Sequence, residues 1–281
     1  MLDWWYQVVD ALLPFQWAQH LFMKNALLAV LLATPLFGLL GTMIVSGRMA
    51  FFSDSLGHGA FTGIALGSLM GVVSPLWAAS AFSVLFAITI TLIKNRTRAS
   101  ADTVIGVFSS TAVALGLVIM SLGGGFNKFS GYLIGDILSI TPLEIALLAG
   151  LLAAVLALWA ALYNRLLLTS INQSLAASRG INTLAAETFF TAAVAIVVTV
   201  TIQWVGLLII NSLLVLPAAA ARNVSGNTRR YHLLSVLIAW MSGVAGLIVS
   251  YYAGTASGAT IVLAAAGFYF GSFALRNRVR G

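Results

Sequence analysis

An acid and a histidine stand four residues apart in the stretch Gly47 to Gly67, which reads GRMAFFSDSLGHGAFTGIALG. On a helix, this spacing places Asp54 and His58 one turn apart on the same face, close enough to share a cation or exchange a proton. Imidazole and carboxylate are suitable ligands for zinc, manganese or ferrous iron. The spacing therefore indicates a metal site. The alternative is that Asp54 pairs with Arg48 while His58 hydrogen-bonds a neighbouring helix.

A second polar pair, Asn211 and Ser212, interrupts the apolar run LLIINSLLVLP. The amide oxygen of Asn211 could complete a metal site with Asp54 and His58, or it could hydrogen-bond across a helix interface. The remaining acids that adjoin apolar runs are interpreted as helix-start residues, because a carboxylate stabilises the free amides there. These acids are Asp102, Asp136, Glu144 and Glu187.

The composition indicates that a membrane-spanning helix positions these residues. The chain has 281 residues, of which 60% are hydrophobic and 7% charged, whereas a soluble domain has about 25% charged residues. Long apolar runs without strict alternation favour helices over a barrel. An acid and a histidine inside such a chain are a functional-site hypothesis. The sequence has no cysteine, which excludes disulfides and thiolate metal sites.

Apolar runs follow one another along most of the chain and predict eight or nine transmembrane helices. The run Thr188 to Ala221 is too long for one span, and we expect a reversal near Gln203 and Trp204. The other runs are roughly Ala26 to Val45, Ser55 to Val73, the stretch after Pro75 up to Ile93, Val104 to Leu122, Leu143 to Tyr163, Leu233 to Tyr252 and Gly258 to Leu275.

Three regions are predicted from this pattern. Residues 1–25 form an interfacial amphipathic segment rich in tryptophan, residues 26–275 form a single transmembrane domain, and residues 276–281 form a basic cytoplasmic tail. A polar loop of about residues 164–187 interrupts the domain, with a short helix expected around Gln173 to Arg179 that Gly180 stops.

The basic residues predict the orientation in a cell membrane. With the amino terminus outside and the carboxyl terminus in the cytoplasm, only Lys24 and Lys128 remain on the outer side, as the positive-inside rule requires. The net charge of +7 is scattered over short gaps between apolar runs, which argues against nucleic-acid binding.

Three functional classes are compatible with these features. The chain carries no recognisable nucleotide-binding loop, so a transporter of this sequence would take energy from a partner or from a gradient. A secondary transporter or channel would use Asp54 and His58 as a proton or cation relay. A membrane enzyme could pair Ser55 with His58, but no oxyanion motif accompanies them.

Five stretches in sequence order resemble the membrane permease subunits of ABC importers for zinc, manganese or ferrous iron. The first is the Gly47 to Gly67 stretch, and the others are SADTVIGVFSSTAVALGLVIMSL, GYLIGDILSITPLEI, VGLLIINSLLVLPAAAARNVSG and SGATIVLAAAGFYFGS. The resemblance implies an all-α architecture similar to that of the cobalamin and iron-siderophore importer permeases.

The resemblance also implies partners and residue roles. The permease would be a homodimer that contacts a cytoplasmic ATP-binding-cassette ATPase and receives its ion from an extracytoplasmic metal-binding protein. Asp54 and His58 match the acid and histidine of the family's metal path, and Asn211 falls where a further oxygen ligand could join it. Zinc is favoured over manganese, no cofactor is bound permanently, and ATP acts only through the partner, so the chain itself is not an enzyme.

By the same analogy, the stretch Ser170 to Asn182 matches the cytoplasmic element that couples such permeases to the ATPase. The residues expected to carry this coupling are Gln173, Ser174, Leu175, Ala176, Ala177, Ser178, Arg179 and Gly180.

Overall fold

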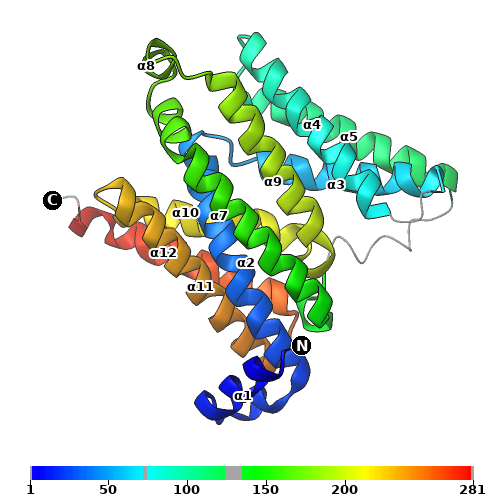
Figure 1. Cartoon of the computed structure of the whole chain (residues 1–281), viewed down its shortest axis with the longest axis vertical. Coiled ribbons are helices and arrows are strands. Elements are labelled where there is room, and N and C mark those ends of the chain that lie inside the picture. Colours follow the sequence, from blue (N-terminus) through cyan, green and yellow to red (C-terminus); the bar gives the residue numbers. More distant parts are fainter. Residues whose placement is uncertain (1, 72–74, 124–134, 280–281) are drawn as a thin grey trace. The chain divides into compact units, whose positions relative to one another are not determined.

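The structure is a computed structural model that describes residues 2–71, 75–123 and 135–279 (Figure 1). Every regular element in these ranges is a helix. The chain divides into two compact units, which are described separately. Unit 1 comprises Met1–Thr42, Ile134–Ala154 and Trp204–Gly281, and unit 2 comprises Met43–Leu133 and Val155–Gln203. The single transmembrane domain expected from the sequence stays a prediction.

Unit 1 is built on a bundle of long apolar helices preceded by a short amphipathic one. Its elements are α1 (Asp3–Leu12), η1 (Gln16–Gln19), most of α2 (Leu21–Ser46), η2 (Ile137–Ser139), the start of α7 (Pro142–Ile171), α10 (Leu207–Val224), α11 (Thr228–Ala253) and α12 (Ser257–Val279). Helices α10, α11 and α12 pack against one another. Because Gly41 has no side chain, α2 approaches the backbone of Leu214 in α10, as small residues permit between membrane helices.

Unit 2 contains the helix that carries Asp54 and His58. Its elements are the end of α2, α3 (Phe52–Leu69), α4 (Pro75–Arg96), α5 (Ala101–Gly123), the end of α7, α8 (Gln173–Ser178) and most of α9 (Thr183–Val205). Helix α3 packs against both α4 and α5, and Figure 1 shows the three side by side. Thr62 of α3 donates a hydrogen bond to the Ala112 carbonyl oxygen of α5 at 2.6 Å.

The helices confirm the predicted polytopic, all-helical membrane protein. Over the described ranges, seven helices are long and apolar enough to cross a membrane, namely α2, α4, α5, α7, α9, α11 and α12. Helix α10 contributes a shorter apolar helix, Ile209–Val224, and α3, which is 18 residues long, is not among the seven. Lys128, the end of the second predicted span and the last two residues of the predicted tail lie outside the described residues.

The long run from Thr188 to Ala221 is divided as expected, but at a slightly later position. Helix α9 continues through Gln203 and Trp204 to Val205, and the break falls at Gly206. The backbone φ of Gly206 is 81°, a conformation that favours glycine. The predicted polar loop is also shorter than expected, because α7 continues to Ile171 and α9 already begins at Thr183.

Candidate functional site

Asp54 and His58 lie on the one open strip of a helix that is otherwise buried. From Phe52 to Gly67, every residue is buried apart from Asp54, His58 and Leu66, which follow one another at intervals of one or two turns. The side chain of Asp54 is 47% exposed and that of His58 is 30% exposed. Asp54 belongs to the first turn of α3, where the helix dipole favours a negative charge.

Close packing on the opposite sides of α3 fixes this orientation. Gly59 lies against the ring of Phe86, and Gly63 lies against the backbone of Ala79, both in α4. Phe61 belongs to a buried apolar cluster with Ile64, Ala65, Ala79 and Met120. The glycines of α3 thus allow close approach of α4, and the acid and histidine are left facing away from the packed sides.

The geometry of the pair suits a shared cation. Nε2 of His58 and Oδ2 of Asp54 are 3.5 Å apart. Two ligand bonds of about 2.1 Å that meet at a tetrahedral angle would separate their donor atoms by about 3.4 Å. The observed separation is therefore close to that of two ligands on one tetrahedral ion. Among the described residues, no three His, Cys, Asp or Glu side chains gather into a larger metal-binding cluster.

Asn211 lies near the start of α10, and its Oδ1 atom is buried. Helix α10 belongs to unit 1, whereas Asp54 and His58 belong to unit 2. The structure brings the acid and the histidine together, and the part of Asn211 in a metal path stays a prediction.

Elsewhere in unit 1, two of the stretches that carry the family resemblance contact each other. They are GYLIGDILSITPLEI and VGLLIINSLLVLPAAAARNVSG, and the contact is between Gly135 and Gly206. Gly135, with a φ of 67°, lies against the backbone of Gly206. A cavity of about 550 Å³ adjoins this contact and is lined by residues of three resembling stretches. Among them are Gly135, Asp136, Leu138, Ile209, Ser212, Ser257 and Gly258. Asp136 caps η2 by accepting a hydrogen bond from the Leu138 amide at 3.0 Å, which agrees with its predicted structural role.

Helix α8 is the short helix predicted in the polar loop. Asn172 caps its start by accepting a hydrogen bond from the Leu175 amide at 3.0 Å. Its end is set by Gly180, whose φ of 73° cannot continue a helix. The side chain of Leu175 is exposed, whereas Ala176 is fully buried. The sequence thus builds a capped, compact helix that presents an apolar side chain outward.

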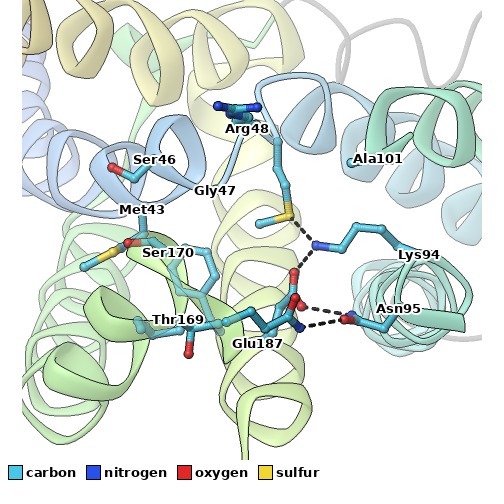
Figure 2. Close-up of a pocket in the computed structure, with 14 residues that line it drawn as sticks. Met43, Ser46, Gly47, Arg48, Lys94, Asn95, Ala101, Thr169, Ser170 and Glu187 are labelled. Carbon is cyan, nitrogen blue, oxygen red and sulfur yellow. Dashed lines mark hydrogen bonds and ion pairs between the residues drawn. The ribbon is translucent and has the colours of Figure 1, made fainter. Parts of the chain in front are cut away.

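A cavity of about 480 Å³ lies beside α8, and polar side chains bridge its walls (Figure 2). Lys94 at the end of α4 forms an ion pair with Oε1 of Glu187 in α9. Asn95 donates a hydrogen bond to Oε2 of Glu187 at 2.9 Å. Gln173 of α8 in turn donates a hydrogen bond to Oδ1 of Asn95 at 3.3 Å.

This cluster is the feature that sequence reasoning missed. Glu187 was interpreted as a helix-start acid, but in the structure it lies a full turn inside α9 and pairs with Lys94 and Asn95. Glu144 does have the predicted role, because it accepts a hydrogen bond from the Thr141 amide at 2.8 Å. One sequence signal could have corrected the interpretation of Glu187. Asn182, five residues earlier, is a good N-cap residue and does cap α9, so no acid is needed at the position of Glu187 to start the helix.

Comparison with known proteins places this architecture in a family. The model of the ABC 3 transport family matches residues 19–276. The chain is 31% identical to the high-affinity zinc uptake system membrane protein ZnuB of Buchnera aphidicola subsp. Baizongia pistaciae, over 84% of this chain and 90% of the relative. It is 28% identical to the manganese import system permease protein ScaB of Streptococcus parasanguinis, over 98% and 96% of the two chains.

A solved structure has the same fold. PsaBC from Streptococcus pneumoniae in complex with Fab superposes with a TM-score of 0.78 at 28% identity, and the match covers 97% of this chain and 95% of that chain.

Proposed function

Because the chain belongs to the ABC 3 transport family, we propose that it is the membrane permease subunit of an importer that moves a divalent transition-metal ion into the cytoplasm. Zinc is the favoured ion and manganese the next, since relatives named for the uptake of each cover most of the chain. The observation that carries the proposal is the 3.5 Å separation of the His58 and Asp54 donor atoms on the open strip of α3.

Asp54 and His58 form a transient site through which the ion passes. A closed four-ligand site would hold zinc too tightly for release, whereas two side-chain ligands leave positions for exchangeable water. Asn211 supplies a further oxygen ligand along the same path. The partial exposure of both Asp54 and His58 gives an ion access to them.

Helix α8 is the element through which the ATPase acts. Residues 173–180 are compact because Asn172 caps the start and Gly180 ends the helix. The 45% exposed side chain of Leu175 gives the ATPase an apolar contact. ATP binds only to that partner, and the permease catalyses no reaction itself.

The assembly contains two copies of this chain, the ATPase and an extracytoplasmic metal-binding protein. The amino terminus lies outside and the carboxyl terminus in the cytoplasm, which places Lys94, Arg96 and Arg98 on the cytoplasmic side. Residues 1–25 lie in the outer headgroup layer. In support of this, α1 has one buried residue, Val9, and its Trp4 side chain is 61% exposed.

Uptake by the reconstituted complex tests this function. The chain is co-purified with its ATP-binding-cassette ATPase and placed in vesicles, and radioactive zinc or manganese is supplied together with the metal-binding protein. We expect uptake that requires ATP and disappears when the ATPase cannot hydrolyse it. Equal uptake without the ATPase would instead establish the secondary transporter, in which Asp54 and His58 relay protons or cations.

Variants at the pair test the site itself. Asp54→Ala and His58→Ala should each lower uptake by about tenfold or more, because loss of a direct ligand should cost at least as much as loss of an outer-shell partner. Asp102→Ala is the matched control, since Asp102 also lies in the first turn of a unit 2 helix. Normal uptake in both site variants, with the complex assembled, would remove the pair from the ion path.

A further inference from the structure

A row of side-chain contacts leads from α8 to the start of α3. It begins at Gln173, whose Nε2 donates to Asn95, and passes through Glu187 to Lys94. Nζ of Lys94 also contacts the Met49 sulfur at 3.4 Å. We propose that this row, Gln173–Asn95–Glu187–Lys94–Met49, transmits displacements of α8 to α3, and that Glu187 is its central positioning residue.

Glu187 joins two helices at one point, since its two oxygens bind consecutive residues of α4. Its side chain is 12% exposed and that of Lys94 is 18% exposed. The hydrogen bond to Asn95 lies at an exposed position, but charge-assisted hydrogen bonds are about twice as strong as neutral ones. Removal of the carboxylate would leave Lys94 without its ion-pair partner and would release Asn95 from α9, so both connections fail together.

Met49 conveys the position of Lys94 to α3. Its side chain is 5% exposed, so it cannot move independently of its surroundings. Its amide donates to the Ile44 carbonyl oxygen of α2 at 3.0 Å, and its own carbonyl oxygen accepts from the Phe52 amide of α3 at 2.9 Å. Met49 is therefore held at the point where α3 begins, five residues before Asp54.

Gln173 is the only residue of α8 among the described residues that line this cavity. Its bond to Asn95 joins α8, the element proposed to meet the ATPase, to α4, and the row continues from there to the start of α3. The functional meaning of the row rests on the proposed function. The mechanical connection between α8 and α3 does not depend on it, so the two can be tested separately.

The absence of cysteine allows a direct test of the connection. A single cysteine at Phe51, which is 65% exposed just before α3, is spin-labelled in the full chain in nanodiscs. Gln173→Ala and Glu187→Ala should each raise the mobile fraction of this label by at least about twofold, as expected for energetic coupling between linked residues. Gln173→Ala is the sharper variant, because it leaves the ion pair intact.

Thr191→Val is the matched control. Thr191 and Thr91 form another hydrogen bond between α9 and α4, at 3.0 Å, and the other hydrogen bonds of their hydroxyl groups stay within their own helices. This variant should leave the label at position 51 unchanged. An unchanged label in Gln173→Ala, or an equal change in Thr191→Val, would overturn the proposal, since the row would then be a structural contact and nothing more.

Transport measurements provide an independent test of the same variants. In the reconstituted complex, Glu187→Ala should lower the number of zinc or manganese ions moved per ATP by about fivefold, while the ATPase still co-purifies. An unchanged ratio would show that the row has no role in coupling. If the unmodified complex moves neither ion, the proposed function fails. The mobility of the spin label at position 51 then decides by itself whether α8 and α3 are connected.

Discussion

Replacement of Gly63 by alanine should force α3 away from α4. A Cβ atom at this position would lie 2.6 Å from the Ala79 Cα atom and 2.9 Å from the Phe82 Cβ atom. Ordinary contacts of this kind begin near 3.4 Å. Because the Ala79 atom belongs to the backbone, no rotamer change can relieve the overlap, and the two helices must separate by several tenths of an ångström.

Two opposing effects determine the size of the change. Overpacking of a well-packed contact costs about 1–3 kcal/mol, whereas replacement of a helical glycine by alanine gains up to about 1 kcal/mol in helix propensity. Gly106 in α5 separates the two effects, because nothing lies within 4 Å of a Cβ atom built there. Gly106→Ala should show the propensity gain alone, and the difference between the variants should equal the packing term.

Thermal unfolding of the purified chain in detergent measures this difference. Gly63→Ala should unfold at a temperature at least about 2 °C below that of Gly106→Ala. It should also lower metal uptake in the reconstituted complex, because Asp54 and His58 belong to the displaced helix. The reasoning is refuted if Gly63→Ala is as stable as Gly106→Ala, since the close approach of α3 and α4 would then be absent.

Three further predictions follow from other contacts. Gly135→Ala should prevent normal assembly of unit 1, detected as aggregation on size-exclusion chromatography, because its φ is 67° and a Cβ atom would overlap the Gly206 backbone. Thr62→Val removes the α3–α5 hydrogen bond and should destabilise the chain by about 1 kcal/mol in thermal unfolding. Thr111→Val, which removes a hydrogen bond within one exposed helix, should change stability less. Leu175→Asp should weaken ATPase association by about tenfold or more in a binding assay, since it places a charge on the exposed apolar side chain of α8; unchanged association would exclude α8 from the contact.

Much of the fold follows from local pattern. The all-helical class and the positions of most spans were predicted from the length of the apolar runs, and the break in the run from Thr188 to Ala221 from its excess length and its polar Gln203. The short helix after residue 172 was predicted from its polar composition and Gly180. The family resemblance carried by five stretches is confirmed by the match over residues 19–276. These features depend on neighbours in sequence, so spacing alone could reveal them.

The pairing of Asp54 with His58 was predictable for the same reason, because an interval of four residues determines their separation on any helix. The exposure of this pair was not predictable. It depends on which side of α3 packs against Phe86 and Ala79. The glycines of α3 allow close packing, but the sequence does not indicate which helix will pack against them.

The sequence by itself determined that the chain is a helical membrane protein with an acid and a histidine one turn apart. Only the tertiary structure revealed the connection between Gln173, Asn95 and Glu187, and its continuation to Lys94 and Met49. These residues come from four separate segments, and each one alone resembles an ordinary helix end. Their contacts arise because all of them line one cavity, which brings polar side chains that are far apart in sequence within hydrogen-bond reach.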